Sequence, residues 1–208
     1  QFSQEQKILT DELHLLAQDL HQKRKKAAAL LIQGVNTELQ DLNMKGLLFG
    51  IHLKEIQAVV STGISEIEFT TQSGSHDTPR PLAKFASGGE LSRILLALKR
   101  VIGLSDWPRT YLFDEVDAGV SGLTAEKVGR KLRAIARGQQ IICVTHLPQV
   151  AAFADHHYLI QKSTQRGGDE VHVSFLEHKE QKVDEIARLI SGAKITPTSR
   201  KHARVLIA

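Results

Sequence analysis

Apolar residues in the first 42 positions recur at the spacing of a helix. Leu9, Leu13, Leu16 and Leu20 are separated by four, three and four positions. The same stripe continues with Ala28, Leu31, Val35, Leu39 and Leu42. This pattern predicts a single helix over residues 1–42, about 60 Å long at roughly 1.5 Å per residue. So narrow a stripe is typical of one strand of a coiled coil, and we expect the partner strand in a segment upstream of this chain.

The pattern changes after residue 43 to one that predicts strands. Phe49, Ile51 and Leu53 alternate with polar residues, and residues 64–69 do so less regularly, which favours a hairpin-like pair of strands. Residues 72–81 are polar and contain prolines, so we expect an exposed loop there. A helix is then predicted from near Ser87. Its expected buried residues are Leu91, Ile94, Leu95, Leu98 and Val101.

The second half of the chain has the spacing of a βαβ unit. We predict buried strands over residues 110–113 and 140–145, joined by a helix near 122–137 that buries Val128, Leu132 and Ile135. This order predicts an α/β fold with a parallel sheet covered on both faces. Further strands near 156–163 and 170–177 flank a hairpin turn at 166–169. Helices are expected at 180–191 and at 197–207, the latter capped by Thr196 with Pro197 in its first turn.

Composition restricts the class of protein without identifying it. With 41% hydrophobic and 24% charged residues, the chain is typical of a soluble globular protein. No run approaches 18 apolar residues, so we expect no contact with a membrane. Its start lacks both a Met and a signal-peptide layout, which suggests a piece of a longer chain. The one cysteine, Cys143, cannot form an internal disulfide and fits a reducing cytoplasm. The net charge of +4 is compatible with a polyanionic partner but does not establish one.

Three stretches carry residues suited to nucleotide chemistry. The first, Ser87-Gly88-Gly89-Glu90, opens a predicted helix, where bare backbone N–H groups and the helix dipole favour a phosphate. Ser87 and Glu90 alone also match a capping box, a common start for any helix. The second is Asp114-Glu115 at the end of a buried strand, where one carboxylate can hold Mg²⁺ through water and the next can orient an attacking water. Taken alone, such an acidic pair is often only the exit of a strand.

Two more features follow the acidic pair. The loop from Val116 to Gly122 contains Asp117 and ends in Ser121, which by itself is simply a cap for the next helix. His146 follows the second buried strand; a lone histidine there is usually structural, but it can also contact a terminal phosphate. Asp114 lies 27 residues after Ser87 and 32 before His146. This order and spacing match the signature motif, Walker B strand, D-loop and switch histidine of ABC-type ATPases.

At residues 86–90 and 114–122 the chain resembles the RecN family of bacterial DNA-repair proteins, which are relatives of the SMC proteins. Leu82-Ala83-Lys84, residues 144–150 and residues 187–192 extend the resemblance over essentially the whole chain. The resemblance implies the C-terminal lobe of an ABC/SMC-type ATPase head, with a P-loop NTPase-like parallel sheet. Residues 1–43 would be the returning coiled-coil arm, and residues 44–208 the lobe. It also implies a cytoplasmic, nucleoid-associated protein that acts in recombination and double-strand-break repair.

The resemblance assigns a role to each candidate residue. Ser87, Gly88, Gly89 and Glu90 would face ATP held by the opposite head of a homodimer. Asp114 would hold Mg²⁺ through water, and Glu115 would be the catalytic base. Asp117 would belong to the D-loop that crosses the dimer. His146 would sense the γ-phosphate. The implied partners are the N-terminal half of the same protein, a second head, and DNA.

Departures from the general ABC pattern define the alternatives. Ala86 replaces the usual signature leucine and Glu90 replaces glutamine, both as in RecN. No Gly-x-x-x-x-Gly-Lys-Ser/Thr occurs in the 208 residues, so the phosphate loop must come from another segment and this chain alone should be inactive. A transporter's nucleotide-binding subunit would usually have a proline where Val116 stands. A non-hydrolysing clamp of the same fold would have no need of Glu115.

Two smaller features have their own alternatives. The basic run Lys23-Arg24-Lys25-Lys26 could contact DNA phosphates, but it fits the solvated face of a coiled coil better. The pair His156-His157 lacks a third ligand at metal spacing, so zinc is not expected.

Overall fold

The computed structural model describes residues 2–74, 77–84, 88–103, 107–165 and 168–207. The chain divides into two compact units, one formed by Gln1–Ser87 with Ala97–Ile102 and the other by Gly88–Leu96 with Gly103–Ala208. The arm helix and the first hairpin therefore share a unit. The assignment of residues 1–43 and 44–208 to an arm and a lobe stays a prediction.

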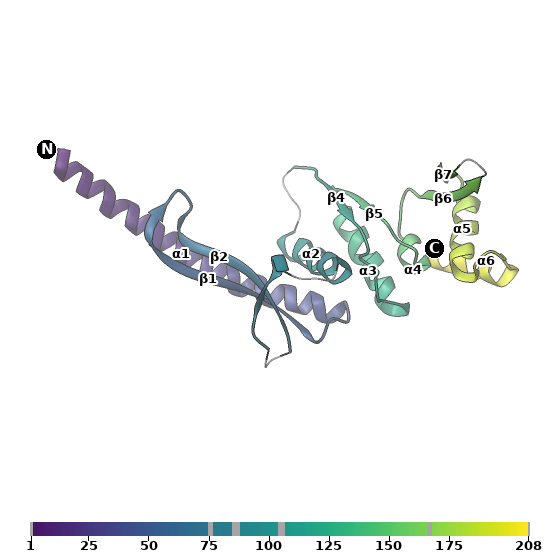
Figure 1. Cartoon of the computed structure of the whole chain (residues 1–208), viewed down its shortest axis with the longest axis horizontal. Coiled ribbons are helices and arrows are strands. Elements are labelled where there is room, and N and C mark those ends of the chain that lie inside the picture. Colours follow the sequence, from purple (N-terminus) through teal and green to yellow (C-terminus); the bar gives the residue numbers. More distant parts are fainter. Residues whose placement is uncertain (1, 75–76, 85–87, 104–106, 166–167, 208) are drawn as a thin grey trace. The chain divides into compact units, whose positions relative to one another are not determined.

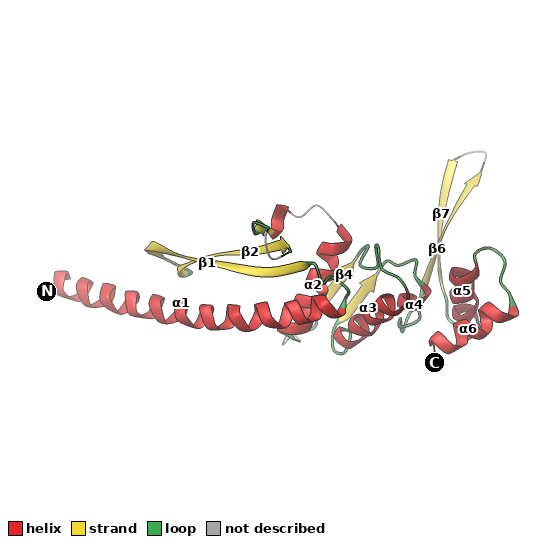
Figure 2. Ribbon diagram, turned by 90° about the horizontal axis from the view of Figure 1, so that it is seen from below, coloured by secondary structure: helices red, strands yellow, loops and turns green. Residues whose placement is uncertain are grey.

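The first unit consists of a long helix and an antiparallel sheet. Helix α1 (Phe2–Asp41) runs alongside the hairpin of β1 (Leu47–Val60) and β2 (Gly63–Ser73), as Figures 1 and 2 show. The Asn36 side chain joins them, because its Nδ2 donates to the Phe49 carbonyl at 2.9 Å and its Oδ1 accepts from the Phe49 N–H at 2.8 Å. The predicted helix and hairpin are confirmed.

The two ends of α1 differ in burial. Val35 and Leu39 are buried near the C-terminal end, whereas Leu9 and Leu16 are exposed. An apolar stripe that stays in water is what a coiled-coil strand without its partner would show. The expected loop at 72–81 is wrong at both ends, because β2 runs to Ser73 and Arg80–Pro81 forms a short strand, β3, paired with β2; the 3₁₀ turn η1 (Leu82–Lys84) follows.

The second unit contains the predicted βαβ arrangement. Strands β4 (Thr110–Phe113) and β5 (Gln140–Cys143) are parallel, and α3 (Gly122–Ile135) connects them. Helix α3 buries Val128, Leu132 and Ile135 as predicted, and in Figure 2 it lies along this pair of strands. The expectation that both faces are covered is wrong: Leu112 is 64% exposed and Ile142 is 47% exposed. The described residues place no element over that face.

Helix α2 (Gly88–Ile102) buries only part of the predicted side. Ile94 is fully buried as predicted, and so are Leu96 and Ala97, whereas Leu91 and Leu95, also expected inside, are each 40% exposed. The buried side includes the polar Arg93, whose side chain bonds the loop after β4. Because the prediction counted only apolar positions, it could not include an arginine on the packed side.

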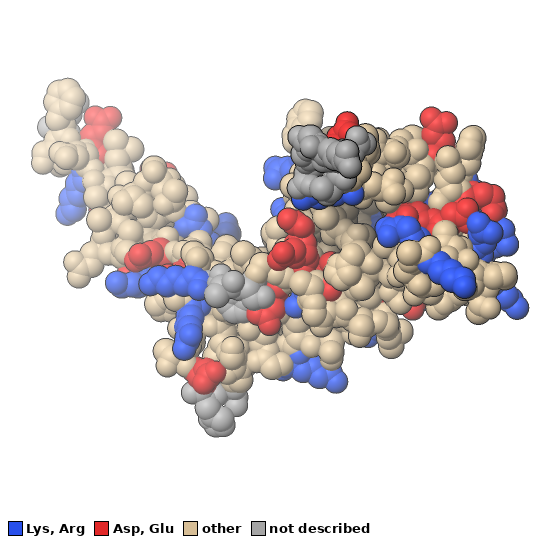
Figure 3. Space-filling view, turned by 45° about the vertical axis from the view of Figure 1, so that its right-hand side comes forward, with Lys and Arg blue, Asp and Glu red and all other residues tan. Residues whose placement is uncertain are grey.

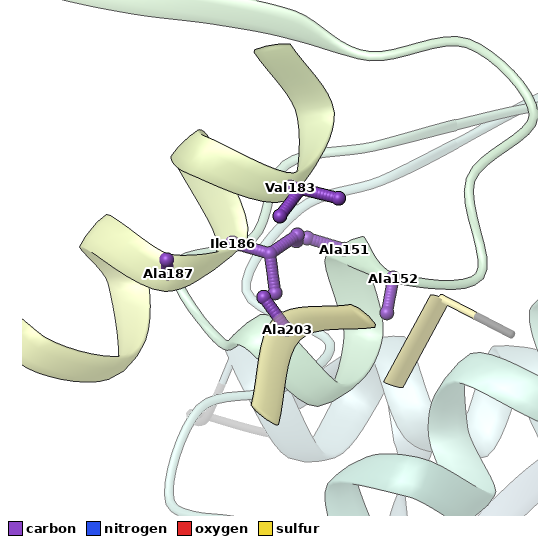
Figure 4. Packing of buried hydrophobic residues seen from close by; sticks show 6 residues of the cluster. All are labelled: Ala151, Ala152, Val183, Ile186, Ala187 and Ala203. Carbon is purple, nitrogen blue, oxygen red and sulfur yellow. The ribbon is translucent and has the colours of Figure 1, made fainter. Parts of the chain in front are cut away.

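The rest of the second unit forms a hairpin and a helical core. Strands β6 (Tyr158–Gln165) and β7 (Gly168–Phe175) are antiparallel as predicted, while Arg166 in the expected turn lies outside the described residues. Helices α4 (Pro148–Ala151), α5 (Lys179–Ser191) and α6 (Pro197–Ile207) pack together. Their shared core, drawn in Figure 4, consists of Ala151, Ala152, Val183, Ile186, Ala187 and Ala203. The Thr196 cap of α6 is confirmed, because Thr196 Oγ1 accepts from the Ser199 N–H at 3.1 Å.

The surface carries charges of both signs. On the face drawn in Figure 3, Lys and Arg side chains alternate with Asp and Glu side chains over a largely uncharged background. In the first unit, Lys23 pairs with Asp19 at 2.7 Å, and Arg24 donates to the Thr62 carbonyl at 2.6 Å. Part of the basic run is thus engaged within the chain. Among the described residues, no helix has the length and apolar character needed to cross a membrane.

Candidate nucleotide-binding site

The glycines at the start of α2 lie directly against the turn that follows β4. A Cβ atom added to Gly89 would stand 2.6 Å from the Ala118 Cβ and 2.8 Å from the Glu115 carbonyl oxygen. A Cβ on Gly88 would lie 3.0 Å from Glu115 Oε2. Position 89 therefore admits only glycine without a shift of the backbone, which is one of the uses of glycine where two chain segments approach closely. Ser87 lies outside the described residues.

Hydrogen bonds fasten the same helix to the residues after β4. Ser92 Oγ donates to the Asp114 carbonyl at 2.7 Å, and the Arg93 guanidinium donates to the carbonyls of Val116 at 3.3 Å and Ala118 at 2.6 Å. Desolvation lowers the pKa of Arg93, while the nearby carboxylates of Glu90 and Asp117 act in the opposite direction. These contacts hold the first turns of α2 and the loop after β4 as one piece.

The acidic pair projects from the end of β4. Asp114 and Glu115 are both exposed, and Glu115 has a φ of 54°, in the left-handed region. A residue other than glycine is costly in that conformation, and such strain clusters at functional sites. The Ala118 N–H bonds the Glu115 carbonyl at 2.9 Å and closes the turn. The turn thus brings the Glu115 carboxylate to the glycines of α2.

Asp117 and His146 meet at the ends of the two parallel strands. Asp117 is only 2% exposed, and its Oδ2 accepts a hydrogen bond from the Thr145 hydroxyl. His146 is largely exposed, with its Nδ1 3.8 Å from the same carboxylate oxygen. Burial, aided by the charges of Asp117 and Asp114, raises the pKa of the neighbouring Cys143 thiol to about 12, so this cysteine should be unreactive.

The candidate residues therefore form two adjoining groups. Gly88 and Gly89 meet Glu115, while Asp117 meets His146. Both groups follow the carboxyl ends of parallel strands, where open α/β sheets bind ligands. Asp114 is an exposed carboxylate at that edge. It suits Mg²⁺, which binds through one or two carboxylates together with substrate phosphates and waters. No three-carboxylate or histidine cage for a metal is found in the described part of the chain.

Sequence reasoning missed three residues of this arrangement: Ser92, Arg93 and Thr145. Arg93 could have been found by its place beside Ile94 on a helix whose neighbouring positions are apolar. Ser92 and Thr145 carry no such signal, because only their partners in space distinguish them from ordinary polar residues. In the cap of α3, Ser121 occupies the predicted position, but its side chain makes no capping hydrogen bond.

Comparison with known proteins finds DNA repair proteins of several bacteria. The chain is 38% identical over 215 residues to the DNA repair protein RecN of Streptomyces coelicolor, covering 98% of this chain and 37% of that protein. It is 34% identical over 206 residues to RecN of Bacillus subtilis, covering 92% and 36%. RecN of Halalkalibacterium halodurans matches at 38% over 88% of this chain and 33% of its own length. The chain thus spans about a third of these relatives. No family model matches.

Solved structures show the same fold. The Smc head domain with an extended coiled coil from Pyrococcus furiosus, bound there to the C-terminal domain of ScpA, aligns with a TM-score of 0.54 over 88% of this chain and 44% of that one. The corresponding domain with a coiled coil and joint from Pyrococcus yayanosii gives 0.51 over 82% and 30%. Sequence identities are 18% and 19%. The chain has a mixed α/β, SMC head-like fold with a long N-terminal helix.

Proposed function

Because nearly the whole chain is homologous to about a third of the RecN DNA repair proteins, we propose that it is the C-terminal part of an ATP-hydrolysing head. One observation carries the proposal: two glycines at a helix start, an acidic pair and a histidine gather at one edge of a parallel pair of strands. A chain that used this fold only as scaffold would have no reason to hold Glu115 in a left-handed conformation beside those glycines.

Each residue has a task that suits its position. The N–H groups of Gly88 and Gly89 lie in the first turn of a helix, where they have no partner within the helix, and they would donate to a phosphate. Asp114 would hold Mg²⁺, which offsets phosphate charge when bound. Glu115, exposed and next to the glycines, would accept a proton from the attacking water. His146 would contact the terminal phosphate, with Asp117 behind it.

The chain also needs a second lobe. It lacks a phosphate loop, and Leu112, Ile142 and Val144 leave an apolar face of the β4–β5 pair exposed. Burial of apolar area contributes about 25 cal/mol per Å², so an added segment would gain by covering this face. We propose that the N-terminal part of the same protein supplies the phosphate loop, covers the exposed face of β4–β5 and provides the partner helix for α1. Two such heads would join on ATP, coupled to DNA in repair.

The test is Glu115→Gln in the full-length protein that carries this chain. Removing the proton acceptor should lower ATP turnover by about a hundredfold or more, since general bases contribute about 10²–10⁴. ATP binding should persist. Glu126→Gln on α3, which removes a carboxylate paired with Arg130, is the matched control and should turn over normally. Unchanged turnover in Glu115→Gln would remove Glu115 from the base role.

A further inference from the structure

Asp117 is a buried carboxylate that needs a hydrogen-bond donor. A charged group placed away from water is costly unless it is hydrogen-bonded. Among the described residues, the Thr145 hydroxyl donates to Asp117 Oδ2. His146 Nδ1, at 3.8 Å, is too distant for a hydrogen bond. Arg93 is near enough to act on Asp117 by its charge, but its hydrogen bonds go to the carbonyls of Val116 and Ala118. Thr145 is therefore the side chain that bonds this carboxylate directly.

The same hydroxyl also accepts a hydrogen bond. The Leu147 N–H donates to Thr145 Oγ1 at 3.1 Å, and Leu147 is the N-cap residue of α4. A hydroxyl can donate and accept at once, which neither an aliphatic nor an ammonium group can do. His146 lies in the sequence between Thr145, which carries the hydroxyl, and Leu147, whose N–H donates to it. One atom thus joins the loop that carries Asp117, the residue before His146 and the residue after it.

From this geometry we infer that Thr145 is a positioning residue, whose hydroxyl sets the place of His146 relative to the Asp117 loop. The inference rests on the proposed function, in which His146 meets the terminal phosphate. Without the hydroxyl, Asp117 Oδ2 loses the hydrogen bond from Thr145 and the Leu147 N–H loses the Thr145 acceptor. The Thr145 hydroxyl bonds Asp117 and Leu147, so it would act on the site through these neighbours.

The experiment compares Thr145→Val with Thr145→Ser in the full-length protein. Valine keeps the shape of threonine and removes the oxygen, while serine keeps the oxygen. We expect Thr145→Val to lower kcat for ATP hydrolysis by about tenfold to hundredfold, because misplacement by an ångström can cost about that much. KM for ATP should change by less than about threefold, since the hydrogen bond between Thr145 and Asp117 is not part of the proposed ATP-binding surface. Thr145→Ser should restore most of kcat.

A matched control removes a hydroxyl elsewhere on the same strands. Thr110 Oγ1 donates to Gln140 Oε1 at 2.7 Å, at the opposite end of β4 and β5. Thr110→Val should leave kcat unchanged. Hydrogen–deuterium exchange without nucleotide gives a readout independent of turnover. Peptides covering residues 114–122 and 144–152 should exchange faster in Thr145→Val than in the wild type, in Thr145→Ser or in Thr110→Val.

The outcomes separate this inference from the proposed function. An inactive wild-type protein, or an active Glu115→Gln variant, would count against the proposed function, while the exchange data would still test the link made by Thr145. If the wild type is active and Thr145→Val matches it in both kcat and exchange, the inference is wrong. It is also wrong if Thr145→Ser is as impaired as Thr145→Val, because shape rather than the hydroxyl would then matter.

Discussion

Apolar side chains are buried in the helical core of α4, α5 and α6 but partly exposed on the strand pair β4–β5. Val183, Ile186 and Ala187 are completely buried in the helical core. In and just after the strands, Leu112, Ile142 and Val144 are between 47% and 64% exposed. The helices thus complete a core from one stretch of chain, whereas the strands that carry the candidate site leave one face uncovered. In this chain the strands beside the candidate site are less completely buried than the helical core.

The largest effect on stability is expected from a substitution in the buried core of α4, α5 and α6. Ile186→Ala removes a fully buried side chain from the centre of the cluster in Figure 4. Such truncations cost about 2–5 kcal/mol, because transfer and cavity terms add. Urea unfolding of the 208-residue chain, followed by circular dichroism, should show that loss. A loss below about 1 kcal/mol would mean that the α4–α6 core is not closed in solution.

An intermediate effect tests how α3 and α4 meet. A Cβ at Gly129 would stand 2.3 Å from Phe153 Cδ2 and 3.1 Å from the Gln149 carbonyl oxygen. Overpacking costs about 1–3 kcal/mol, against a gain of about 1 kcal/mol from alanine in a helix. We expect Gly129→Ala to destabilise by about 1 kcal/mol in the same urea titration. Combining it with Phe153→Leu should recover part of this loss, and a stabilised single variant would contradict the packing.

The smallest effect on stability is expected at the exposed face of the β4–β5 pair. Leu112→Ala removes a side chain that is mostly in water, so the 208-residue chain should lose no more than about 0.5 kcal/mol. If another part of the full-length protein covers this face, the same substitution there should cost about 2 kcal/mol or more. Thermal unfolding of both proteins measures the difference. Equal shifts in the two would show that the face stays open.

Much of the fold followed from the order of residues. The long helix, both hairpins, the parallel βαβ unit and the Thr196 cap lie where periodicity and turn chemistry put them, because these signals act over a few neighbouring positions. Local patterns were wrong for part of the buried face of α2 and for the second face of the β4–β5 pair. In the first case Arg93 takes a buried place by bonding two carbonyls. For the β4–β5 pair, apolar strands indicate that both faces are to be covered, but they do not indicate which segment covers them.

The candidate site divides in the same way. The sequence by itself determined which residues are candidates for the site, since Gly88, Gly89, Asp114, Glu115 and His146 stand out by type and spacing. Only the tertiary structure decided that Glu115 turns left-handed toward those glycines, and that Ser92, Arg93 and Thr145 fix the loop around them. The reason is physical: a hydroxyl or a guanidinium gains its role from the atoms it meets, and those come from positions far away along the chain.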